Sequence, residues 1–240
     1  MNQEHTVRSY DEELAHLNTL IARMGGLAEA QLEGAINALS RRDSDLASKV
    51  IASDVKVDEL EHEVHAFTVR LLALRQPVAQ DLRAIVGALK ISGDLERIAD
   101  YAANVAKRAL VLNQLPPVKP VAGIPRLGRL VQEIVKEVLD AYVEKDDEKA
   151  IKVWKQDEEV DDMYTGLFRE LITYMMEDPR NITACIHLMF IAKNIERIGD
   201  HATNIAETIH FLVQGTPIRE ERPKGHNGIL PDPSRLTSED

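Results

Sequence analysis

Acidic side chains recur in pairs along this 240-residue sequence, and the members of each pair are four positions apart. Residues i and i+4 lie on one face of an α-helix, so each pair would place two carboxylates side by side. Ionised neighbours repel each other, and a hard cation such as Mg²⁺, Mn²⁺ or iron would relieve that repulsion through oxygen ligands. The pairs are Asp54 and Asp58, Glu96 and Asp100, Asp157 and Asp161, and Glu196 and Asp200.

The helical phase of these carboxylates follows from the apolar stripe of the same segment. With Ile98 at the centre of the stripe, Glu96 and Asp100 fall about 160° away at roughly 100° per residue. We therefore expect these two carboxylates, and Glu196 and Asp200 in the repeat, to face solvent with no lysine or arginine beside them. Solvated acidic surface is the competing interpretation. The recurrence of the pairs in both halves of the chain is what favours a metal site.

Signatures of catalysis are missing from the sequence. It has no Gly-rich phosphate loop, no G-x-S-x-G and no H-E-x-x-H motif, and no nucleophile with a base beside it. Three Glu-x-x-His patterns would suit a di-iron site only if they projected into a four-helix core. We expect a protein that is not an enzyme. A metal-dependent phosphoesterase that uses the outward carboxylates, and a metal-free helical scaffold, stay open as alternatives.

The elements that must position these residues are long helices. Proline breaks helix interiors, and the long windows between the prolines show apolar residues every three or four positions. The pattern predicts an all-α protein whose second and fifth helices begin after caps at Asp43 and Asp146. The expected helices span 8–40, 43–74, 78–113, 124–144, 146–176 and 179–214.

An internal repeat divides the chain into two halves. Residues 94–106 match residues 194–206 at seven of thirteen positions, and a second block at 43–58 matches 146–161. Two matched blocks in the same order indicate a duplicated unit of three helices joined by short turns. The sequence therefore predicts two tandem, similar three-helix bundles. These bundles are expected over 8–113 and 124–214.

Composition narrows the class of protein further. The net charge of −11 disfavours binding to a nucleic-acid backbone, and the single cysteine, Cys185, excludes an intramolecular disulfide or a Cys-rich zinc site. No apolar stretch approaches the roughly 20 residues that cross a bilayer, so we expect a cytoplasmic protein. Residues 215–240 are rich in Pro, Gly, Ser and charge, and we expect a disordered tail there.

Five short motifs give the chain a family resemblance. Taken together and in this order, they resemble the PhoU family of bacterial phosphate-uptake regulators over residues 8–214. The motifs are Met24-Gly25-Gly26, Arg75-Gln76-Pro77 with Asp81-Leu82-Arg83, Glu96-Arg97-Ile98-Ala99-Asp100, Tyr174-Met175-Met176-Glu177-Asp178, and Glu196-Arg197-Ile198-Gly199-Asp200.

The resemblance implies a function and a set of partners. Similar proteins are pairs of three-helix bundles, often homodimers, and bind metal clusters of iron or zinc through surface E/D-x-x-x-D motifs. They act with the nucleotide-binding subunit of the phosphate ABC transporter and with a membrane sensor histidine kinase, and they repress the phosphate-starvation response.

Transferred to this chain, the resemblance places metal ligands on Glu96, Asp100, Glu196 and Asp200. Their partners on the preceding helices would be Asp54, Asp58, Asp157 and Asp161. Ala99 stands where the second motif has Gly199, and we do not expect its methyl group to block a metal. We expect the turn Arg75-Gln76-Pro77 to contact a protein partner.

Overall fold

The computed structural model describes residues 2–75, 77, 79–118, 123–220, 222 and 225, with side chains from residue 10 onward. The secondary structure of the described residues is entirely helical, which confirms the predicted all-α class. The elements are α1 (Asn2–Arg41), α2 (Ser44–Ser53), α3 (Val55–Arg75), α4 (Ala79–Gln114), α5 (Gly123–Glu144), α6 (Asp147–Lys155), α7 (Asp157–Glu177), η1 (Pro179–Asn181) and α8 (Ile182–Gln214). In the described part of the chain, no helix is long and apolar enough to cross a membrane.

The middle helix of each half is interrupted, so the prediction of continuous helices over 43–74 and 146–176 was wrong. The first interruption is at Asp54, whose carbonyl accepts the Val57 amide at 2.9 Å, a three-residue step, as well as the Asp58 amide at 3.3 Å. The second is at Gln156, whose amide donates to the Val153 carbonyl at 3.0 Å. Each tight turn lies at or beside a predicted site residue, because Asp157 follows Gln156 directly.

The helix caps follow the sequence more closely. Asp43 accepts the Leu46 amide at 2.9 Å and Asp146 accepts the Lys149 amide at 3.0 Å, which confirms both predicted N-caps. Gly215 ends α8 with a φ of 75°, a left-handed conformation that favours glycine.

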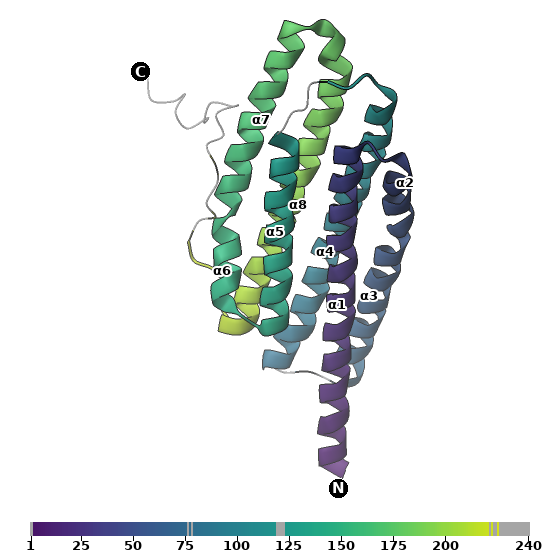
Figure 1. Ribbon diagram of the computed structural model, residues 1–240. Helices are drawn as coiled ribbons and strands as arrows, with labels where there is room; N and C mark the ends of the chain where they lie inside the picture. Colours follow the sequence, from purple (N-terminus) through teal and green to yellow (C-terminus); the bar gives the residue numbers. More distant parts are fainter. Residues whose placement is uncertain are drawn as a thin grey trace, which may run out of the picture.

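The two bundles share one continuous hydrophobic core. The long helices lie side by side along a common direction, and α4 and α8 run next to each other at the centre of the molecule (Figure 1). The contact between α4 and α8 is the most extensive between any two helices of the described chain. Leu95 and Ile98 of α4 and Ile195 and Ile198 of α8 are completely buried in this common core. The halves are similar bundles, but they are fused along these two helices.

The second contact between the halves is formed by α1 and α5 and has an approximate two-fold symmetry. A Cβ atom at Gly25 of α1 would lie 2.5 Å from Leu139 of α5, and one at Gly128 of α5 would lie 2.8 Å from Ile36 of α1. Gly25 and Gly128 are equivalent positions of the repeat, and so are Ile36 and Leu139. Each half therefore presents the same surface to the other, as the subunits of a symmetric dimer do.

Candidate functional site

The acidic pairs of the first half come together where α2, α3 and α4 meet. We call Asp54, Asp58, Glu61, Glu96 and Asp100 the first cluster. Partial burial raises the pKa of Asp54, and the Asp58 and Asp100 carboxylates add to that rise. Because Asp100 acts on Asp54 across two elements, the structure brings these predicted residues into one electrostatic group.

Glu96 belongs to the same group from its position on α4. Burial raises its pKa; the Arg97 guanidinium, 3.6 Å away, opposes the rise, and Asp100, Asp58 and Glu61 add to it. A carboxylate with a raised pKa is one whose charged form the folded chain disfavours. The first cluster is therefore a region whose negative charge is only partly balanced. Glu61 belongs to it through its effect on Glu96, and His65 Nε2 lies 2.9 Å from Glu61 Oε1.

The second half brings together the equivalent residues Asp157, Asp161, Glu196 and Asp200, which we call the second cluster. Glu196 is 7% exposed, so the expectation that this carboxylate faces solvent was wrong, and Asp157 is 4% exposed. The cause is the packing around the long helices, since α8 is contacted by α4, α5, α6 and α7. The part of α8 that carries Glu196 therefore lies against neighbouring helices, whereas the Asp200 side chain is 42% exposed.

The second cluster also contains basic side chains, contrary to expectation. Lys193 donates to Glu196 Oε1 at 2.6 Å, whereas Glu196 Oε2 is buried without a hydrogen-bond partner. Arg222, from the segment after α8, donates to both oxygens of Asp157 at 2.7 Å and to Asp200 Oδ1 at 2.8 Å. Sequence reasoning missed Arg222, because nothing in the pattern of the tail links it to helices 65 residues earlier.

Comparison with known proteins decides the family. The sequence profile of the PhoU domain matches residues 21–109 and matches again at residues 124–209. The chain belongs to the PhoU family. It is 55% identical over 222 residues to the phosphate-specific transport system accessory protein PhoU homolog of Caulobacter vibrioides, covering 92% of this chain and 96% of that protein.

Solved PhoU structures have the same fold. The crystal structure of PhoU from Pseudomonas aeruginosa matches with a TM-score of 0.84 and 42% identity, covering 86% of this chain and all of that one. The phosphate transport system regulatory protein PhoU from Streptococcus pneumoniae matches with a TM-score of 0.81 at 28% identity, covering 88% of this chain and all of that one. These matches and the repeated PhoU domain support the predicted pair of tandem bundles.

The donor chemistry of both PhoU domains fits a hard cation, although the ligands are not assembled as a finished site. Carboxylate oxygens suit magnesium, manganese and iron, whereas zinc more often takes nitrogen or sulfur as well. The unpaired, buried Glu196 Oε2 is an acceptor that a cation would satisfy. Within the described residues, no group of three or more His, Cys, Asp or Glu side chains is already arranged to hold a metal. Binding would therefore require the side chains to move toward the ion.

The turn Arg75-Gln76-Pro77, predicted to contact a partner, joins α3 to α4 in the first PhoU domain. Arg75 donates to both Glu13 oxygens, at 2.7 and 3.0 Å, which joins the end of α3 to α1. Pro77 is half-buried and lies before α4, which begins at Ala79. Gln76 lies outside the described residues. Arg75 therefore has a structural contact of its own in addition to any contact with a partner.

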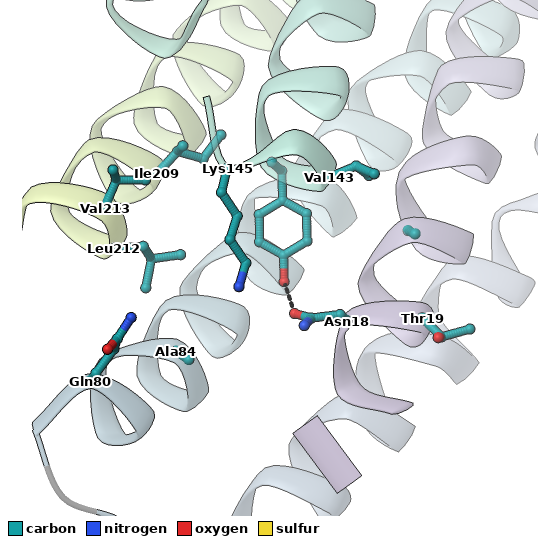
Figure 2. Close-up of a pocket in the computed structure, with 11 residues that line it drawn as sticks. Asn18, Thr19, Gln80, Ala84, Val143, Lys145, Ile209, Leu212 and Val213 are labelled. Carbon is teal, nitrogen blue, oxygen red and sulfur yellow. Dashed lines mark hydrogen bonds between the residues drawn. The ribbon is translucent and has the colours of Figure 1, made fainter. Parts of the chain in front are cut away.

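A pocket of about 430 Å³ lies where the two PhoU domains meet. No sequence pattern predicted this pocket. The Tyr142 hydroxyl donates to Asn18 Oδ1 at 2.8 Å. In Figure 2 the Lys145 amine and the Gln80 amide point into the space. Leu212 and other aliphatic side chains form the rest of the wall, and none of the described residues that line it carries a carboxylate. Burial raises the pKa of Tyr142, so this hydroxyl stays protonated and remains a donor.

Proposed function

We propose that this chain is a cytoplasmic, non-enzymatic regulator of phosphate uptake that works as the accessory protein of a phosphate transport system. The observation that carries this proposal is the 55% identity, over 92% of the chain, to a protein named as such an accessory protein. The absence of a nucleophile with a base beside it in the sequence agrees with action through binding. The acidic net charge favours a protein partner over a nucleic acid.

The proposed partners are the nucleotide-binding subunit of the phosphate ABC transporter, a membrane sensor histidine kinase and a second copy of the chain. The surface proposed for the transporter subunit is the turn Arg75-Gln76-Pro77. A guanidinium at such a surface can pair with a carboxylate of the partner and set the choice of partner more than the stability of the fold.

Co-purification of the transporter subunit with tagged variants of this chain tests the turn. Arg75→Glu should weaken capture of the subunit, whereas Arg129→Glu, a charge reversal on the exposed face of α5, should not. Arg75→Glu also breaks the contact with Glu13, so the combined Glu13→Arg and Arg75→Glu variant is the matched control, because it restores an ion pair with reversed polarity. Capture that returns to normal in the double variant would show that the Arg75 charge serves the fold and not the partner.

We further propose that the first and second clusters bind metal ions, with iron, zinc, magnesium and manganese as the candidates. Asp54, Asp58, Glu96 and Asp100 would hold one ion or cluster, and Asp157, Asp161, Glu196 and Asp200 the other. A bound cation would neutralise the mutual repulsion of these carboxylates and so hold the middle helix of each bundle against the long helix. The raised pKa of Asp54, Glu96, Asp161 and Glu196, caused first by burial and increased by neighbouring carboxylates, supports clusters whose negative charge is not fully balanced.

Elemental analysis of the chain purified without a chelator tests metal binding, with the Glu96→Gln, Asp100→Asn double variant as the comparison. Metal that co-purifies with the parent chain and falls in the variant would support the first cluster as a ligand set. Equal metal content in both proteins would contradict it. A phosphatase assay on the metal-loaded chain tests the alternative function, and measurable turnover lost in the same variant would replace the regulatory proposal by a hydrolytic one.

A further inference from the structure

The segment after α8 places a basic side chain, Arg222, on the second cluster. We propose that Arg222 occupies the second cluster as an internal cation in competition with a metal ion, so that the first cluster binds metal more tightly and the second binds it only when the tail is released. This inference rests on the proposed metal binding. It adds that the two otherwise similar clusters differ in occupancy, and that the tail of the chain is the cause.

The guanidinium of Arg222 is held by several charge-assisted hydrogen bonds. Its Nε and one terminal nitrogen donate to the two oxygens of Asp157, both at 2.7 Å, in the parallel fork that arginine forms with a carboxylate. The same terminal nitrogen donates to Asp200 Oδ1 at 2.8 Å, and the other lies 3.4 Å from Asn204 Oδ1. Arg222 therefore connects α7 to α8 at the place where a metal ion would do so.

The backbone of the same segment also docks on α7. The Gly225 amide donates to Asp161 Oδ2 at 3.2 Å, and Gly225 is buried. A Cβ atom at this position would lie 2.5 Å from Asp161 Cβ and 2.9 Å from the Asp162 backbone nitrogen. Backbone atoms cannot move aside as a flexible side chain can, so only glycine permits this approach. Two separate contacts, one ionic and one steric, thus place the tail on the second cluster.

The two clusters differ in their internal cations. Lys193, which donates to Glu196, stands at the position that Gly93 occupies in the first half. Together with Arg222, it gives the second cluster two close cations for four carboxylates. In the first cluster, among the described residues, Arg97 Nε lies 3.6 Å from Glu96 and His65 Nε2 lies 2.9 Å from Glu61, and the Lys107 charge opposes the rise in the pKa of Asp54. The first cluster therefore keeps the larger share of its negative charge for an external cation.

Arg222 and a metal ion cannot use the same oxygens at once. Arg222 takes both oxygens of Asp157 and one of Asp200, which leaves Asp161, the second oxygen of Asp200 and the unpaired Glu196 Oε2 as the remaining acceptors. A ligand whose site is open for only a fraction of the time shows an affinity reduced by that fraction. By reciprocity, a cation that enters the second cluster must release the tail.

Titration with Mn²⁺, followed by the electron paramagnetic resonance signal of the free ion, tests the competition in the full-length chain. The Glu96→Gln, Asp100→Asn background removes the ligands of α4 from the first cluster, so that the second can be followed alone. In this background Arg222→Gln should tighten Mn²⁺ binding about tenfold or more, as expected when a site is freed from a docked competitor. Gly225→Val should do the same without any change of charge. Arg219→Gln, an exposed arginine three residues earlier in the same segment, is the matched control and should change nothing.

Hydrogen exchange of the metal-free chain supplies a second measurement that does not depend on metal affinity. The peptide containing Gly225 should exchange slowly in the parent chain, and faster after Arg222→Gln or after addition of Mn²⁺. Mn²⁺ binding to the second cluster that is unchanged by both Arg222→Gln and Gly225→Val would overturn the competition while leaving metal binding in place. A Gly225 peptide without protection in the metal-free parent would overturn it as well. Failure of every variant to bind Mn²⁺ would overturn both the competition and the proposed metal binding.

Discussion

Replacing Glu96 with glutamine should make the metal-free chain more stable, although most substitutions at half-buried positions destabilise a protein. The Glu96 side chain is 31% exposed, and Asp100, Asp58 and Glu61 all disfavour its charge. Glutamine keeps the shape of the side chain and removes the charge. The substitution therefore leaves the packing of α4 in place and relieves the repulsion within the first cluster.

The size of the effect follows from the neighbours of Glu96. Each like-charge neighbour at this range costs about 0.2–0.5 kcal/mol. Three acidic neighbours, offset in part by Arg97, therefore give a gain of about 0.5–1 kcal/mol in the free energy of unfolding. For a chain of this size, that gain raises the melting temperature by about 1–4 °C.

Thermal melts in chelator at low ionic strength measure this gain. Glu33→Gln, an exposed position on α1 outside the cluster, is the control and should leave the melting temperature unchanged. The advantage of Glu96→Gln should shrink in about 1 M salt, where the screening length falls to about 3 Å. A melting temperature below that of the parent chain, or a gain that salt does not reduce, would refute the electrostatic explanation.

Three further outcomes follow from the same structure. Ile98→Ala should lower the free energy of unfolding by about 2–5 kcal/mol in a denaturant titration, because the Ile98 side chain is completely buried, although it lies only two residues from Glu96. Gly25→Val should cost about 1–3 kcal/mol, because Leu139 lies 2.5 Å from the added Cβ atom, and an unchanged melt would contradict the close packing of α1 on α5. Folding raises the pKa of Glu96. The stabilisation that comes from protonated Glu96 is therefore complete when the pH lies below the ordinary pKa of about 4.3, and it is lost as the pH rises through the raised pKa. Lowering the pH from about 7 to about 5 in chelator should therefore narrow the gap between Glu96→Gln and the parent.

Local sequence patterns were enough to predict the helices and the duplication. The caps at Asp43 and Asp146 are confirmed because a cap depends on residues three positions apart. The burial of Leu95 and Ile98 follows from the spacing of apolar residues along one helix. The interruption at Asp54 was not visible, since a single tightened turn leaves the apolar spacing on either side almost unchanged.

These local patterns could not predict contacts between distant parts of the chain. The spacing of residues along α8 places Glu196 opposite the apolar stripe of that helix. This spacing does not show which other helices cover the face that carries Glu196. The docking of Arg222 on Asp157 depends on the fold of the whole second bundle. The assignment of Glu96, Asp100 and their partners as metal ligands stays a prediction, as does the role of Arg75 at a partner surface.

The central claim, that this chain restrains phosphate uptake and the response to phosphate starvation, is tested most directly in its native host. The measurement is the expression of phosphate-starvation genes in a deletion strain grown with abundant phosphate, beside the same strain complemented with the parent chain. We predict high expression in the deletion strain and repression restored by the complementing chain. Starvation genes that stay repressed in the deletion strain would contradict the regulatory role.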